Sequence, residues 1–110
     1  METKDALTAL AALAHETRLA VFRLLVETGP EGLPVGKIGE RLGLAPSTLS
    51  FHLKELTHAG MIEPRQEGRF VYYSANYDQM NALLGYLSEN CCQGEGCVTV
   101  AAPKSQRKRA

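Results

Sequence analysis

The 110-residue sequence has no tryptophan, only three cysteines, and an aromatic content of 6%. It also contains no apolar run close to the roughly 20 residues that a membrane-spanning helix requires. The N-terminal residues 1–5 lack the basic segment and apolar core of a secretory signal peptide. These absences argue against a disulfide-framework protein and a membrane protein, and they predict a cytoplasmic location.

The chain also has no net charge, because twelve Lys and Arg residues balance twelve Asp and Glu residues. Residues 104–110 carry four of the basic groups and no acid, which leaves eight basic and twelve acidic residues in positions 1–103. A nucleic-acid-binding protein usually presents a basic footprint. DNA binding would therefore require the few cations of the body to gather on one face. The sequence shows no activated nucleophile and no phosphate-binding glycine loop, so an enzyme is not predicted.

The most informative stretch covers residues 46–59. Pro46 suits the first helical position, and Gly60 suits the residue after the last. Three leucines at helical spacing form an apolar stripe: Leu49, Leu53 and Leu56. Small polar, aromatic and cationic side chains occupy the opposite side: Ser47, Ser50, Phe51, Lys54 and His58. The pattern predicts a helix with one buried face and one outer face, which by itself is also typical of an ordinary surface helix.

The neighbouring segments give this helix a context. Apolar spacing predicts four further helices: Thr3–Ala14, Glu16–Glu27, Val35–Leu42, and one that follows an Asn76 cap and runs to about Asn90. Residues 43–45 form a short connection into the helix at 46–59, which is the helix-turn-helix pattern. Two strands around Glu67-Gly68 predict a β-hairpin, with Pro64 placing its first strand at a sheet edge. We therefore predict a mainly α fold with a β-hairpin wing, a winged helix-turn-helix.

The first and last helices supply more apolar surface than a winged helix of about 70 residues needs. We predict a homodimer through these two helices; the alternative is that they pack only on the core of their own subunit. The predicted organisation is a DNA-binding and dimerisation domain at residues 1–90, followed by a cysteine-containing sensor segment and flexible basic tail at 91–110. The tail either adds non-specific phosphate affinity or keeps the end of the chain soluble.

Several co-linear motifs resemble the ArsR/SmtB family of dimeric metal- and metalloid-responsive repressors. They are Leu13-Ala-His-Glu-Thr-Arg-Leu-Ala-Val-Phe-Arg-Leu-Leu25, Ile38-Gly-Glu-Arg-Leu-Gly-Leu44, Ser47-Thr-Leu-Ser-Phe-His-Leu-Lys-Glu-Leu56, Ala59-Gly-Met-Ile62 and Gly68-Arg-Phe-Val-Tyr-Tyr73. The resemblance implies binding to a two-fold operator DNA. Two sensor sites common in that family are absent: residues 35–42 contain no cysteine, and Asp78 is followed by Met80 where the family's zinc site has histidine.

The three cysteines are clustered as Cys91, Cys92 and Cys97. Three thiols without a nearby histidine form a soft ligand set that lacks the fourth ligand zinc normally takes. Trivalent arsenic is satisfied by three thiolates, and some similar ArsR-type proteins carry such a cluster and answer to arsenite. We therefore expect a repressor that arsenic(III), antimony(III) or a trivalent methylarsenical releases from DNA. Other readings are cadmium or lead sensing, a thiol redox switch, incidental cysteines, and a metalloid carrier that does not bind DNA.

The candidate DNA-binding residues come from the helix at 46–59 and the hairpin. They are Ser47, Thr48, Ser50, Phe51, His52, Lys54, Arg65 and Arg69. Within this set His52 lies close to the leucine stripe, so packing or hydrogen bonding is favoured over base contact. Two roles remain open for Thr17 and Arg18, contact with the DNA backbone or local capping, and no ligand pattern includes His15.

Overall fold

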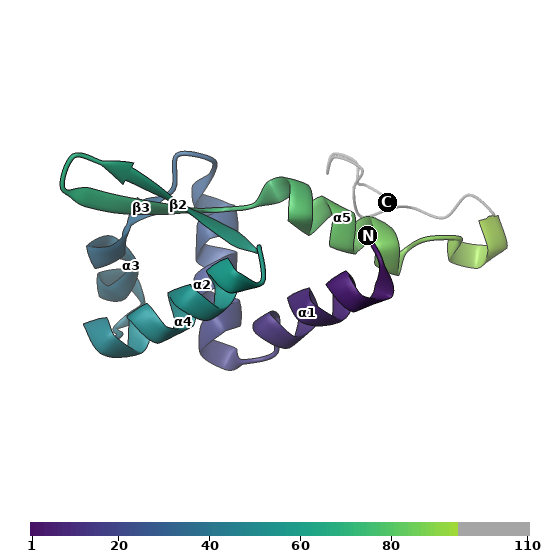
Figure 1. Ribbon diagram of the computed structural model, residues 1–110, viewed down its shortest axis with the longest axis horizontal. Coiled ribbons are helices and arrows are strands. Elements are labelled where there is room, and N and C mark those ends of the chain that lie inside the picture. Colours follow the sequence, from purple (N-terminus) through teal and green to yellow (C-terminus); the bar gives the residue numbers. More distant parts are fainter. Residues whose placement is uncertain (95–110) are drawn as a thin grey trace.

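The computed structural model describes residues 1–94, and these form five α-helices, a three-stranded sheet and a short 3₁₀ turn (Figure 1). The helices are α1 Thr3–Leu13, α2 Glu16–Thr28, α3 Val35–Leu42, α4 Pro46–His58 and α5 Tyr77–Leu87. The strands are β1 Leu33–Pro34, β2 Ile62–Glu67 and β3 Phe70–Ala75, and the 3₁₀ turn is η1 Cys91–Gly94. This architecture confirms the predicted winged helix-turn-helix. No helix in residues 1–94 is long and apolar enough to cross a bilayer.

The wing is a three-stranded antiparallel sheet in the order β1-β3-β2. The hairpin pairs Ile62 with Ala75 at its base and Glu67 with Phe70 at its tip. Its turn consists of Gly68 and Arg69, with Gly68 at φ +63°, a conformation that favours glycine. Strand β2 lies at an edge, as Pro64 predicted. The sequence analysis missed β1, a two-residue strand that fastens the α2–α3 connection to β3.

The elements are arranged so that one end of the molecule carries the helix-turn-helix and the wing, and the other carries α1 and α5 (Figure 1). Helices α3 and α4 lie below the hairpin, and α4 crosses in front of α2. At the opposite end a hydrogen bond between the hydroxyl groups of Thr3 and Tyr86 joins α1 to α5. The candidate DNA-contacting helix is therefore separated from α5, whereas the C-terminal part of α1 lies beside it.

The core lies where α2, α3, α4 and the base of the hairpin meet. Its largest fully buried side chains are Val21, Leu25, Ile38, Leu49, Leu56, Met61 and Ile62. The leucine stripe of α4 is buried as predicted, with Leu49 and Leu56 at 1% and 0% exposure. Burial at roughly 25 cal/mol per Å² of apolar surface makes this stripe the main anchor of α4, since its N-cap, Ala45, provides no side-chain hydrogen bond.

The last helix begins as predicted and ends earlier. The Asn76 side chain accepts a hydrogen bond from the backbone N–H of Gln79, which caps the first turn of α5. The helix ends at Leu87, whereas the sequence analysis extended it to about Asn90. Ser88 is the C-cap residue, and Asn90 has a φ of +58°, which an α-helix does not accommodate. The cysteines thus follow a break in the helix.

Candidate nucleic-acid interface

The outer face of α4 is open to solvent along its length. Ser47, Thr48, Ser50, Phe51 and Lys54 are all exposed, and the Phe51 side chain is 56% exposed. More than half of this large aromatic side chain stays in contact with water, so packing within the subunit leaves most of it available to a partner. Hydroxyl, aromatic and ammonium groups on one helix face match the phosphates, thymine methyl groups and base edges of a major groove.

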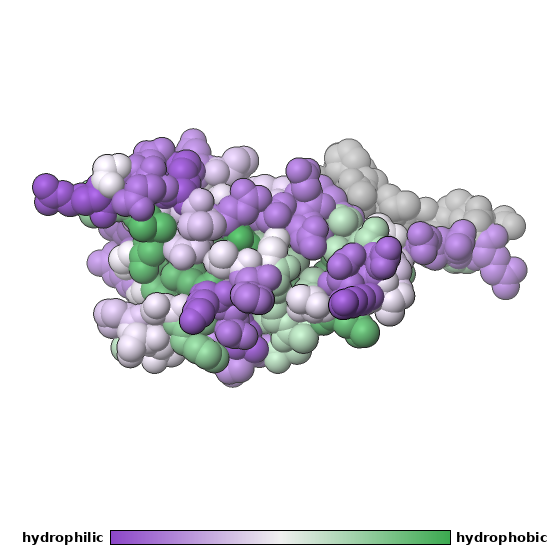
Figure 2. Space-filling view, in the orientation of Figure 1, coloured by the Kyte–Doolittle hydropathy of each residue, from purple (hydrophilic) through white to green (hydrophobic). Residues whose placement is uncertain are grey.

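The wing extends this face. A groove of about 390 Å³ separates α4 from the hairpin and is lined on the helix side by Ser50, Leu53 and Lys54. The opposite wall contains Val71 and Tyr73 of β3. Figure 2 shows apolar surface in the hollow beneath the hydrophilic wing, above α3 and α4. The outer face of α4 and the wing are therefore adjacent parts of one surface.

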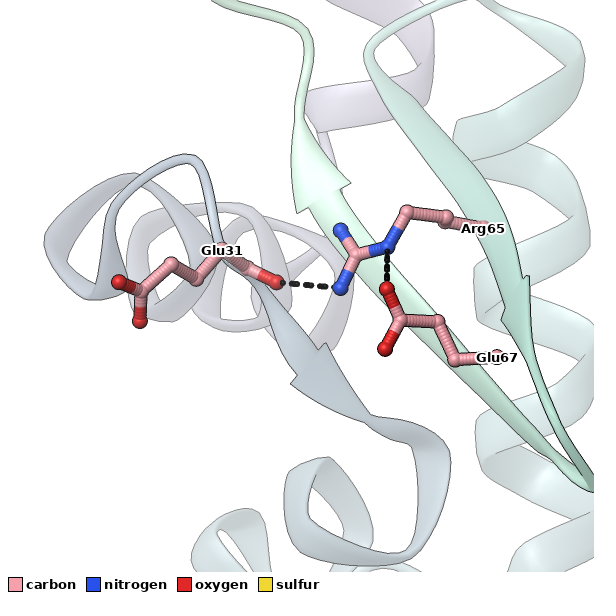
Figure 3. Close-up of polar contacts among 3 residues, drawn as sticks. All are labelled: Glu31, Arg65 and Glu67. Atoms are coloured by element: carbon pink, nitrogen blue, oxygen red, sulfur yellow. Dashed lines mark hydrogen bonds and ion pairs between the residues drawn. The ribbon is translucent and has the colours of Figure 1, made fainter.

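Arg65, one of the two predicted wing arginines, is engaged within the protein (Figure 3). Its Nε donates a hydrogen bond to the Glu67 carboxylate at 2.8 Å, and an Nη donates to the backbone carbonyl of Glu31 at 3.2 Å. The guanidinium also lies over the Tyr72 ring, 5.0 Å from its centroid. These contacts hold the hairpin against the α2–α3 connection, a role that the sequence pattern did not indicate.

Arg69, the second predicted wing arginine, occupies the turn of the hairpin. Its side chain is exposed, and within residues 1–94 it forms no hydrogen bond or ion pair. A guanidinium at the tip of a wing, with all its donors available, is suited to a phosphate oxygen. The two arginines thus have different surroundings although they lie on the same hairpin.

We expect Arg69→Ala and Arg65→Ala to differ in the salt dependence of DNA binding. Loss of a phosphate contact makes the slope of log K against log salt shallower by about 0.9. Arg69→Ala should show this change for each protomer. Arg65→Ala should keep the slope and lose a few tenths to about 1 kcal/mol of folding stability. The loss is small because the ion pair between Arg65 and Glu67 is exposed. Fluorescence anisotropy from 50 to 300 mM salt measures both. An unchanged slope for Arg69→Ala would remove Arg69 from the DNA backbone.

His52 lies on the inner side of α4, at 6% exposure, although it was included among the DNA-binding candidates. Its Nδ1 is 3.3 Å from a guanidinium nitrogen of Arg18, and its ring centroid is 4.8 Å from that of His15. Burial lowers the pKa of His52, and the positive charges of His15 and Arg18 lower it further, while Glu55 opposes them. The ring is in position for packing and hydrogen bonding, the role favoured from the leucine spacing.

Two further residues surround His52: His15, which no ligand pattern included, and Arg18, whose role the sequence left open between DNA-backbone contact and local capping. The His15 ring caps α2 by accepting a hydrogen bond at Nδ1 from the N–H of Thr17, at 3.1 Å. Arg18 also donates from Nε to the carbonyl of Ala12, at 2.6 Å. The only sequence signal for this cap was a histidine directly before the first helical residue. That signal is weak because histidine is not among the preferred N-cap residues.

The predicted cysteine site is only partly within the described residues. Cys91 is half-buried and has a free thiol, whereas Cys92 is exposed and disulfide-bonded. Their sulfur atoms are 3.7 Å apart. Cys97 and the basic tail lie outside the described residues. Within residues 1–94 no group of three His, Cys, Asp or Glu side chains is placed to hold a metal ion.

Comparison with known proteins also indicates a helix-turn-helix protein. A family model described as a helix-turn-helix domain matches residues 13–65. The chain is 38% identical over 77 residues to YceK of Bacillus subtilis, an uncharacterized HTH-type transcriptional regulator, covering 69% of this chain and 76% of YceK. It is 35% identical over 89 residues to the arsenical resistance operon repressor of the same organism, covering 77% and 81% of the two chains.

Solved structures give the same result. HlyU from Vibrio cholerae superimposes with a TM-score of 0.66 at 33% identity, covering 84% of this chain and 100% of that one. The homodimeric winged helix-turn-helix domain of Mb0332 from Mycobacterium bovis gives a TM-score of 0.64 at 26% identity, covering 86% and 88% of the two chains.

The exposed face of α4, its buried leucine stripe and the adjoining wing define a DNA-binding transcriptional regulator of the winged helix-turn-helix class. The relatives place it more narrowly: the chain belongs to the ArsR family. It is a regulator and not an enzyme.

Proposed function

We propose that this protein is a homodimeric repressor that leaves its operator when trivalent arsenic or antimony binds Cys91, Cys92 and Cys97. The observation that carries the proposal is the pair of adjacent sulfur atoms, 3.7 Å apart, directly after the last helix. Once the Cys92 disulfide is reduced, one soft ion can bridge two sulfurs at that separation, and Cys97 would supply the third thiol of a three-coordinate set. The relative named as an arsenical resistance operon repressor supports the same chemistry.

The surface of α1 and α5 supports the dimer. Leu7, Leu10 and Leu87 are 61%, 37% and 58% exposed, and all three lie on the two helices at the end of the molecule away from the wing. A second copy of the chain would bury these leucines, and each fully buried leucine contributes about 2 kcal/mol. Two α4 helices related by a two-fold axis would then read two half-sites of an operator.

The link between inducer and operator is a difference in affinity between two states. The ion must bind the free dimer more tightly than the DNA-bound dimer, and each tenfold loss of DNA affinity corresponds to about 1.4 kcal/mol of coupling. Drawing three sulfurs together beyond Leu87 would reorder the end of α5, which belongs to the proposed dimer interface. A shift there changes the separation of the two α4 helices.

We expect arsenite to release the protein from the DNA upstream of its own gene, and Cys91→Ser, Cys92→Ser or Cys97→Ser to bind that DNA normally without being released. Anisotropy or mobility-shift titrations in a phosphine reductant measure this, because dithiol reductants would capture the arsenite. A variant with all three serines serves as the control. Release of that triple variant by arsenite would place the sensor elsewhere, and absence of binding to this DNA at low salt would overturn the repressor assignment.

Thiol redox regulation is the second candidate, because Cys92 is disulfide-bonded. HlyU, a relative of similar closeness at 33% identity, is a transcriptional activator, so regulators of this kind are not restricted to repression. The same titration, repeated after the phosphine has been removed, separates the candidates: peroxide rather than arsenite changes DNA affinity under redox control, and cadmium or lead does so under divalent-metal control. Membership of a DNA-binding family argues against the metalloid carrier that does not bind DNA.

A further inference from the structure

Three separate parts of the fold meet at one side chain, Arg18. From α2 its Nε donates to the carbonyl of Ala12 in the last turn of α1, at 2.6 Å. A second guanidinium nitrogen lies 3.3 Å from Nδ1 of His52, on the inner side of α4. One planar group thereby joins the end of a predicted dimer helix to the helix with the DNA-facing surface.

Direct packing between α1 and α4 is interrupted beside this link. An open groove of about 730 Å³ lies between the two helices, with Thr8 and Ala11 on one wall and Lys54 and Glu55 on the other. Arg18 lines the same groove. Because solvent and not side chains fills that space, hydrogen bonds through Arg18 carry more of the relative positioning of α1 and α4 than they would in a filled interface.

His52 is in contact with a DNA-facing residue on its other side. The rings of His52 and Phe51 are arranged edge to face with centroids 5.3 Å apart, and Phe51 is exposed on the outer face of α4. A change in the position of the imidazole would therefore move or release the Phe51 ring. The chain of contacts runs from Ala12 through Arg18 and His52 to Phe51.

We propose that Arg18 is a positioning residue for DNA binding, which holds α4 in its DNA-binding orientation relative to α1 by linking Ala12 to His52. The proposal rests on DNA binding alone and is independent of the metalloid site. It assigns Arg18 a role within the protein instead of contact with the DNA backbone.

The link has a protonation requirement. Arg18 is always a donor, so Nδ1 of His52 must be unprotonated to accept. Protonation would place an imidazolium against the guanidinium, next to His15, and only Glu55 would oppose the repulsion. The pKa of His52 is held below its ordinary value, so the link is intact at neutral pH and is lost as the pH falls through that lowered pKa.

The test compares His52→Asn with its parent in a His58→Asn background, which removes the exposed histidine on the same helix. Asparagine Oδ1 replaces the Nδ1 acceptor and does not titrate. As the pH is lowered from 8 until NMR shows that the His52 ring is protonated, we expect the DNA affinity of the parent to fall at least fivefold. His52→Asn also loses the ring contact with Phe51, so its own affinity at pH 8 is the reference, and from that value it should show no such fall. Equal pH profiles for the two proteins would overturn the proposal.

His15→Asn is the matched control. Asparagine is a favourable N-cap and keeps the acceptor for the Thr17 N–H, but it does not titrate. The fall in affinity should persist in this variant and begin at a higher pH, because one positive neighbour of His52 has been removed. Loss of the pH dependence in His15→Asn would assign the effect to the cap and overturn the role of His52.

Arg18→Gln distinguishes positioning from phosphate contact. At pH 8 it should lose at least tenfold in DNA affinity with an unchanged salt slope, whereas loss of a phosphate contact would make the slope shallower by about 0.9. Arg18→Lys keeps the charge but cannot hold two acceptors with a planar fork, so it should behave as Arg18→Gln does. A shallower slope, or full affinity in Arg18→Lys, would contradict the proposal.

Discussion

Lys54→Glu is expected to weaken operator binding at least 100-fold, about 3 kcal/mol, at 0.15 M salt. Lys54 is exposed on the outer face of α4 and lines the groove beside the wing. The substitution removes a cation from a surface that approaches phosphates and puts an anion there, in both protomers of the proposed dimer. The body of the chain contains few cations to compensate, since positions 1–103 hold eight basic residues.

The matched control for this charge reversal is Arg23→Glu. Its side chain is 71% exposed on α2, where it pairs with Glu27 at 3.8 Å and is not part of α4 or the wing. Both substitutions change the net charge by the same amount, but we expect the control to keep its affinity within about fivefold, because distant charges are screened at this ionic strength. Anisotropy titrations measure both affinities, and thermal unfolding should show less than about 0.5 kcal/mol of destabilisation for Lys54→Glu. Equal losses for the two variants would mean that α4 is not the DNA-contacting helix.

The second large effect is expected in folding stability. Gly32, at φ +75°, directly precedes β1, and a Cβ on this residue would lie 2.3 Å from the carbonyl oxygen of Tyr73 in β3. That oxygen belongs to the backbone of the central strand, so it cannot move without disturbing the sheet. We expect Gly32→Ala to lower the free energy of unfolding by about 3 kcal/mol or more, combining backbone strain with loss of the β1–β3 contact.

Gly43→Ala separates the two contributions. Gly43 has a similar φ of +65° at the end of α3, but nothing lies within 4 Å of its Cβ position. Only the cost of the left-handed backbone should remain, about 1 kcal/mol. Urea unfolding at one protomer concentration measures both, since the proposed dimerisation would make apparent stability depend on concentration. If the two variants lost equal stability, the close approach of Gly32 to β3 would contribute nothing.

The helices and the hairpin could be predicted because their information is local. The leucine spacing of α4, the break at residues 29–32 and the change of period after Gly60 each lie within a few neighbouring residues. Strand β1 could not be found in this way, because two residues become a strand only by pairing with β3, about 40 positions later in the chain. The end of α5 was misplaced because its apolar stripe stops at Leu87 while Ser88, Glu89 and Asn90 carry no strong helix-breaking signal.

The candidate interface also has features that local sequence patterns predict and features that depend on long-range contacts. The outer face of α4 followed from helical geometry, and so did the inner position of His52. Long-range contacts account for the remainder. Arg65 is held by a carbonyl 34 residues away, and Arg18 reaches a histidine at the same separation. No spacing rule in the sequence connects such pairs.

The early end of α5 has a consequence for how such a regulator acquires its trigger. Among the described residues every buried side chain precedes position 88, the last being Leu83, and the α4 surface lies earlier still. Residues 88–93 can therefore be rewritten, by mutation over generations or by design, without repacking the half that reads DNA. On the proposed cysteine site, a genetic sensor built on this chain would exchange its chemical input at this end of the chain, while its promoter and reporter stayed the same.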